Sequence, residues 1–167
     1  MNDLENYYNR SPKNLIFISF FASLLLDFIP LDNGFFFWLP EFSALILLYW
    51  SLNRHHTVGI GSAFILGLLI DIGTATPLGL HAFSYTLMTF TVQSYQRQIL
   101  LHSYGIQSAI ICIALCGNWL LLTAARLLAE HRFGGFGGLL SPVVGALLWP
   151  LLNKIMLALL HSHHQRR

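Results

Sequence analysis

Six long runs of apolar residues restrict the folds open to this chain. A helix that crosses the hydrocarbon core of a bilayer needs about 20 mostly apolar residues. The runs predict transmembrane helices over residues 14–30, 36–53, 57–73, 77–95, 104–128 and 140–160. Only 10% of the 167 residues are charged, against roughly 25% in typical soluble domains. The expected fold is therefore all-α, a polytopic helical membrane protein with residues 1–167 in one integral membrane domain.

The second run is the weakest of the six because Pro40 and Glu41 interrupt it. A helix that begins at Pro40 is short for a full span. The preceding stretch FFFWL (35–39) would then lie at the membrane interface, where aromatic rings favour the level of the lipid headgroups. Five spans plus one interfacial segment is thus the alternative to six spans.

Basic residues are unevenly divided between the two sides of a six-span topology. One side receives Arg10, Lys13, Arg54, Arg97, Lys154, Arg166 and Arg167, and the other receives Arg126 and Arg132. Lys and Arg accumulate in the cytoplasmic loops of membrane proteins. The distribution therefore predicts that both termini are cytoplasmic.

Catalytic and metal-binding arrangements are not expected in this sequence. Ser62 and His81 fall on opposite sides of the predicted membrane, so they would not form a protease pair. Asp27 and Asp71 lack the flanking patterns of an intramembrane aspartyl protease. The histidine-rich tail (161–167) is interpreted as a basic segment that lies against anionic lipid. The sequence thus predicts no catalytic residue, no metal, no cofactor and no nucleic-acid partner.

Small residues recur at four-residue spacing in two places, which lets helix backbones approach closely in lipid. The first stripe is Gly59, Ala63 and Gly67, and the second is Gly137, Ser141 and Gly145. Each stripe predicts a packing face for a neighbouring helix of the same chain or for a helix of a partner.

The stretch GLLIDIGTATPLG (67–79) places one carboxylate, Asp71, at the end of an apolar run. Gly73 is typical of a residue that ends a helix. Thr76 and Pro77 are typical of an N-cap followed by the first residue of the next helix. The carboxylate would accept hydrogen bonds from the free N–H groups of the following turn.

Two other roles for Asp71 remain open at this point. Arg126 is expected at a similar depth near the outer end of the fifth span, so an Asp71–Arg126 ion pair would join two hairpins. Alternatively, the carboxylate contacts another protein. The sequence alone does not choose between the cap, the ion pair and the partner contact.

The block LILLYWSLNRHHTVGIGSAFILGLLIDIGTATPLGLHAFSYTL (45–87) resembles the MreD family of rod shape-determining membrane proteins. The shared pattern is an L-L-Y-W span, a short basic turn, then glycines that lead into G-x-x-x-D and a P/T-L-G turn. The matching positions are Gly67, Asp71, Pro77, Leu78 and Gly79. The segment GALLWPLLNKI (145–155), with Trp149 and Pro150, is similar to the last span of that family.

The resemblance implies a non-enzymatic, multi-pass scaffold of the bacterial inner (cytoplasmic) membrane. Such a subunit of the elongation (Rod) complex binds MreC directly, and through the complex it is linked to MreB and to the pair of RodA and a penicillin-binding transpeptidase. It serves rod shape and lateral peptidoglycan synthesis. The family also resembles the membrane subunit fold of energy-coupling-factor transporters. The alternative function is therefore a transporter-like membrane subunit that binds a small lipophilic ligand.

Overall fold

The computed structural model describes residues 13–29, 39–130 and 136–165, and all regular structure in these ranges is helical. The elements in chain order are α2 (Lys13–Asp27), α3 (Phe42–Asn53), α4 (Ile60–Gly73), α5 (Leu80–Ser94), α6 (Gln96–Leu101), α7 (Tyr104–Glu130), the 3-10 helix η2 (Phe136–Leu139) and α8 (Leu140–Gln165). The predicted all-α fold is confirmed for these residues.

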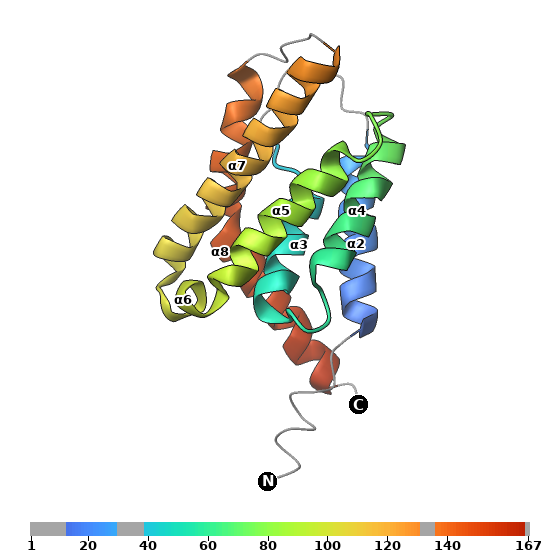
Figure 1. Ribbon diagram of the computed structural model, residues 1–167. Coiled ribbons are helices and arrows are strands. Elements are labelled where there is room, and N and C mark those ends of the chain that lie inside the picture. Colours follow the sequence, from blue (N-terminus) through green and yellow to red (C-terminus); the bar gives the residue numbers. More distant parts are fainter. Residues whose placement is uncertain (1–12, 30–38, 131–135, 166–167) are drawn as a thin grey trace.

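The helices form a bundle in which successive long helices run in opposite directions (Figure 1). α4 packs on α5 and α7 packs on α8, so the chain contains two close antiparallel pairs. The short helix α3 contacts α2, α5 and α8. Its residues from Ser43 to Leu52 are all buried. A helix that is apolar around its whole circumference is expected in such an interior position.

Polar side chains fix the position of α3 at two points. The carboxylate of Asp27, at the end of α2, accepts hydrogen bonds from the backbone N–H groups of Phe42 and Ser43 at 2.9 and 2.8 Å. A carboxylate is favourable there because the first N–H groups of a helix lack partners within the helix. Near the other end of α3, the indole of Trp50 donates to Ser19 Oγ at 2.8 Å.

The surface of the bundle is apolar, whereas several polar residues are buried inside. Large side chains such as Phe17, Ile113 and Leu147 are 71–75% exposed. A soluble monomer rarely exposes so much contiguous apolar surface. Two helical segments, Tyr104–Leu128 and Leu140–Leu160, are long and apolar enough to cross a membrane. The surface is therefore suited to lipid.

The helix boundaries follow the predicted runs, but six full spans are not established. α2 and α5 have 15 residues, α4 has 14 and α3 has 12. At 1.5 Å per residue these helices are about 18–22 Å long, against a hydrocarbon core of about 30 Å. α3 begins after the Pro40–Glu41 interruption, and most of the FFFWL stretch lies outside the described residues.

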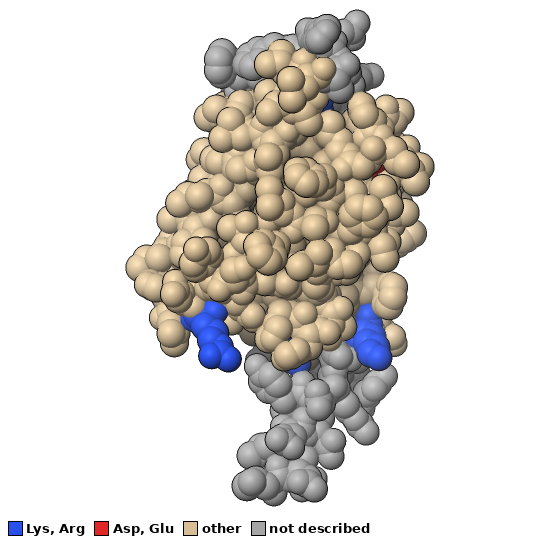
Figure 2. Space-filling model, in the orientation of Figure 1, with Lys and Arg blue, Asp and Glu red and all other residues tan. Residues whose placement is uncertain are grey.

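Basic residues gather at one end of the face that Figure 2 shows. The start of α2 and the end of α8 lie toward this lower end in Figure 1. Arg54, directly after α3, and Arg97, in the lower helix α6, belong to the same end. The uneven distribution read from the sequence is therefore also a spatial one, and a cytoplasmic location of this end remains an expectation.

Candidate functional site

Asp71 lies in the last turn of α4, is 1% exposed, and organises the connection to α5. Its Oδ2 accepts hydrogen bonds from Gly79 N at 2.8 Å and Ala82 N at 3.5 Å. Its Oδ1 accepts from His81 N at 3.0 Å and from Thr76 Oγ1 at 3.1 Å. The carboxylate thus satisfies N–H groups at the start of α5 that have no partner within that helix. It acts as an N-cap supplied by the preceding helix.

The turn between α4 and α5 differs from the predicted one in the place where α5 begins. α4 ends at Gly73, as predicted, but α5 begins at Leu80 with Gly79 as the N-cap residue. The expected cap at Thr76 and helix start at Pro77 are therefore wrong. The physical reason is that Asp71 occupies the capping position, and Thr76 donates to it instead. Gly79 has φ of +97°, a conformation that favours glycine.

The imidazole of His81 lies between two carboxylates. Nδ1 is 2.7 Å from Asp71 Oδ1, and Nε2 is 3.9 Å from Glu41 Oε1. A carboxylate only accepts hydrogen bonds, so Nδ1 carries the hydrogen in this contact. His81 is buried and belongs to α5, whereas Glu41 directly precedes α3. The imidazole therefore links the cap of α5 to the start of the central helix.

Glu41 continues the network to α7. Its Oε2 accepts hydrogen bonds from Tyr85 Oη at 2.9 Å and Asn118 Nδ2 at 3.1 Å. Ser84 Oγ in turn donates to Asn118 Oδ1 at 2.6 Å. We call the set Glu41, Asp71, His81, Ser84, Tyr85 and Asn118 the outer polar network. It joins the end of α4, the start of α3 and the middle of α7 through side chains of α5.

The predicted partner Arg126 is not brought to Asp71. In the described part of the chain, the ion pair of Asp71 is with His81, and Arg126 is half-buried on α7. The donors at the start of α5 follow Asp71 closely in the chain and already surround its two oxygens. Of the three roles left open by the sequence, the geometry matches the helix cap.

One glycine of each stripe lies against another helix of this chain. A Cβ added to Gly67 would lie 2.3 Å from Ala82 Cα, so α4 and α5 are in backbone contact there. Ala63, one turn earlier, is buried, and Gly59 is the N-cap residue of α4. On α8, a Cβ at Gly145 would lie 2.7 Å from a methyl carbon of Leu115 on α7. Ser141 is half-buried in the first turn of α8 and Gly137 belongs to η2.

The family motif on the last helix lies elsewhere in the bundle. α8 continues through Pro150 without a break, although proline removes one backbone donor. Trp149 is buried, and its ring centroid is 6.4 Å from that of Tyr49 on α3. Trp149 therefore belongs to the contact between α8 and the central helix, apart from the outer polar network, and Pro150 follows it within α8.

Sequence reasoning did not identify His81, Glu41 and Tyr85 as members of one site. Asn118 was recognisable as a polar residue within an apolar run, and Glu41 as a charge after a proline. In the chain, Glu41 is 44 residues from its partner Tyr85 and 77 residues from its partner Asn118. Only the packing of α3, α5 and α7 brings them together.

Replacing Tyr85 with phenylalanine is expected to lower the free energy of unfolding by about 1–2 kcal/mol, because one bond to a carboxylate is lost. Thermal unfolding of the purified protein in detergent measures the change. Tyr95→Phe is the matched control, since Tyr95 is 57% exposed. Equal melting temperatures for the two variants would show that the Tyr85–Glu41 bond adds nothing to stability.

An apolar outer surface around a buried network of polar groups defines a helical membrane protein. The family model of the rod shape-determining protein MreD matches residues 9–159. The chain therefore belongs to the MreD family. It is also similar to the rod shape-determining protein MreD of Haemophilus influenzae, with 27% identity over 140 residues that cover 83% of this chain and 86% of that protein. No solved structure matches the chain.

Proposed function

We propose that this chain is a non-enzymatic scaffold of the cell elongation (Rod) complex in the bacterial inner membrane, with both termini cytoplasmic. It holds MreC directly, and the complex links it to MreB and to the RodA–transpeptidase pair. Membership of a shape-determining family supports this proposal. The role of the scaffold is to keep MreC in place during lateral peptidoglycan synthesis.

The turn between α4 and α5 is the surface that we assign to MreC. Leu78 is 72% exposed at the tip of this turn, whereas Asp71 and Gly67 are buried beneath it. The buried residues are engaged within the chain, so they shape the turn and do not themselves offer a contact. The observation that carries the proposal is therefore a rigidly capped turn that presents an apolar side chain from the family motif.

Replacing Leu78 with aspartate is expected to reduce the capture of MreC at least about tenfold, which is the effect of losing roughly 1.4 kcal/mol at a small apolar contact. The measurement is co-purification of MreC with the tagged protein, at equal abundance of the two variants. Leu101→Asp is the matched control because Leu101 is 86% exposed at the opposite end of the bundle, in α6.

MreC capture and melting temperature, each compared between Leu78→Asp and Leu101→Asp, distinguish loss of a contact from loss of folding. If the proposed surface binds MreC, Leu78→Asp captures less MreC than Leu101→Asp, and the two variants have the same melting temperature. Equal capture by both variants would move the MreC contact away from this turn. Loss of capture together with loss of abundance would assign Leu78 to the fold.

One observation favours the second candidate function, a transporter-like subunit that binds a small lipophilic ligand. A cavity of about 310 Å³ lies beside α3, and side chains of several helices line it. The volume is at the lower end of the range for small-molecule sites, about 300–1,000 Å³. Binding at this cavity is compatible with a scaffold, because the cavity is remote from the α4–α5 turn.

A further inference from the structure

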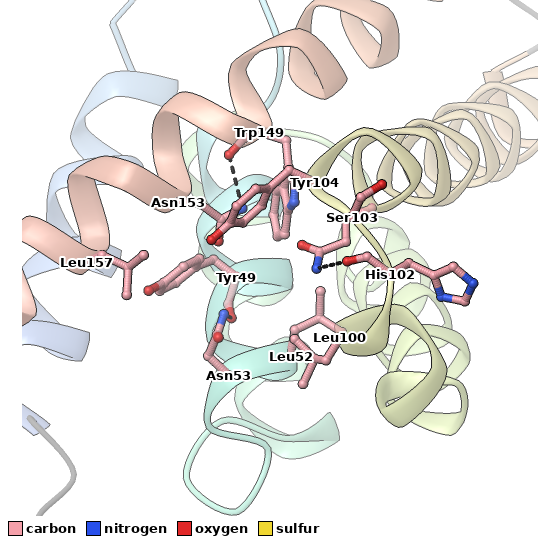
Figure 3. A pocket seen from close by; sticks show the side chains of 11 residues that line it. Tyr49, Leu52, Asn53, Leu100, His102, Ser103, Tyr104, Trp149, Asn153 and Leu157 are labelled. Carbon is pink, nitrogen blue, oxygen red and sulfur yellow. Dashed lines mark hydrogen bonds between the residues drawn. The ribbon is translucent and has the colours of Figure 1, made fainter.

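The cavity lies at the end of the bundle where α3 finishes, opposite the outer polar network (Figures 1 and 3). Its walls come from the second half of α3, the middle of α8 and the connection between α6 and α7. Figure 3 shows the indole of Trp149 directed into the space between Tyr49 and Ser103. The site is thus formed by three segments that are distant in the sequence.

The indole N–H of Trp149 is the feature that points to a ligand. Trp149 is 1% exposed, and its Nε1 has no hydrogen-bond partner among the described residues. An indole nitrogen only donates, and an unpaired buried donor is unfavourable. The other buried indole of the described chain, that of Trp50, does have a partner, Ser19. An acceptor atom placed beside Nε1 would satisfy this donor.

The remaining polar groups of the wall favour an uncharged ligand. The amide nitrogens of Asn53, Gln107 and Asn153 donate to backbone carbonyl groups of their own segments. The described wall contains no Asp, Glu, Lys or Arg. The imidazole of His102 is the one ionisable basic group of the described wall, and it is exposed. A charged group in the cavity would thus have at most this counterion, and desolvation of a poorly paired charge is costly.

Apolar side chains complete the wall of the cavity. Leu100 and Leu157 are each 44% exposed and line the cavity together with the buried Leu52. A ligand that reaches Trp149 therefore passes along hydrocarbon surface. The wall matches an amphiphile with an uncharged oxygen acceptor attached to an acyl chain.

We propose that this cavity binds the glycerol–ester segment of a membrane lipid, with Trp149 Nε1–H donating to an ester carbonyl oxygen. The acyl chains leave along Leu100 and Leu157, and the lipid headgroup stays outside the uncharged wall. The cavity volume of about 310 Å³ accommodates this segment and not a whole lipid. The site is independent of the contact proposed for MreC.

Native mass spectrometry of the full chain in detergent tests the site with two uncharged probes. Dioctanoylglycerol carries ester carbonyl groups, and the corresponding dioctyl ether of glycerol lacks them. The wild type is expected to bind the diester about tenfold more tightly than the diether, as for one buried hydrogen bond. Trp149→Phe, which keeps a ring but removes the N–H, is expected to bind both probes equally and weakly.

Trp119→Phe is the matched control on α7, because Trp119 does not line the cavity. It is expected to retain the preference of the wild type for the diester. Leu157→Trp fills the cavity from α8 and is expected to abolish binding of both probes, so it tests the site even where Trp149→Phe fails to fold.

Three results would overturn the proposal. The first is an equal affinity of the wild type for diester and diether, which would mean that no ester carbonyl accepts a hydrogen bond from Trp149. The second is an unchanged preference in Trp149→Phe. The third is binding of dioctanoylphosphatidic acid alone, which would mean that the headgroup phosphate is recognised in place of the ester. Similar affinities for the phosphatidic acid and the diglyceride support the ester contact.

Discussion

Replacing Asp71 with alanine is expected to lower the free energy of unfolding by about 3–5 kcal/mol, the range observed when one partner of a buried charged pair is removed. The substitution leaves the N–H groups of Gly79 and His81 without their acceptor in a buried place. It also leaves the imidazole of His81 with Glu41 alone, at 3.9 Å. Reversible unfolding of the protein in lipid nanodiscs or detergent measures the loss.

Two further variants test whether the loss of stability comes from the capping carboxylate. Asp71→Asn keeps one acceptor oxygen but turns an amide group toward other donors, so an intermediate loss is expected. Thr91→Ala is the control on α5, because its exposed hydroxyl bonds only to Leu87 O of its own helix. Its effect is expected to stay within about 0.5 kcal/mol. If Asp71→Ala unfolds like Thr91→Ala, the carboxylate is not what holds the turn.

Replacing Gly67 with alanine is expected to lower the free energy of unfolding by about 3 kcal/mol, the upper end of the usual cost of overpacking. The added Cβ would lie 2.3 Å from Ala82 Cα and 2.4 Å from Ala82 N. Both are backbone atoms, so no side chain is able to rotate away. α4 and α5 must separate, and the bonds from Asp71 to the start of α5 lengthen with them.

Gly61→Ala is the matched control on the same helix. A Cβ at Gly61 meets nothing within 4 Å, and alanine favours helix by up to about 1 kcal/mol relative to glycine. This variant is therefore expected to be neutral or slightly more stable in the same unfolding measurement. Equal stabilities of the two alanine variants would mean that α4 and α5 are not in backbone contact at Gly67.

Most helix positions were predictable from the sequence because a hydrophobic run is a local property. Five of the six predicted segments begin within three residues of a helix: α2, α4, α5, α7 and α8 start at residues 13, 60, 80, 104 and 140. α8 begins at residue 140, as predicted. The largest difference is at α3, which begins at Phe42, because Pro40 and the acceptor on Asp27 place the helix start there.

The candidate site was predictable only in part. The role of Asp71 as a cap was predictable because Asp71 is only eight residues from Gly79, across the short connection between α4 and α5. The alternative with Arg126 rested on similar depth in the membrane. Depth does not specify how a helix is rotated about its axis, and that rotation decides which side chains of α7 face α5. Asn118, and not Arg126, reaches the network.

The class of the protein, the order of its helices and the family motif were readable from the amino-acid sequence alone. These properties depend on hydropathy and residue size within about one helix length. The packed helices were needed to show that α3 is the buried centre, that His81 joins Asp71 to Glu41, and that Trp149 lines a cavity. Each of these depends on the relative rotation and crossing of helices, which arise from contacts between residues far apart in the chain.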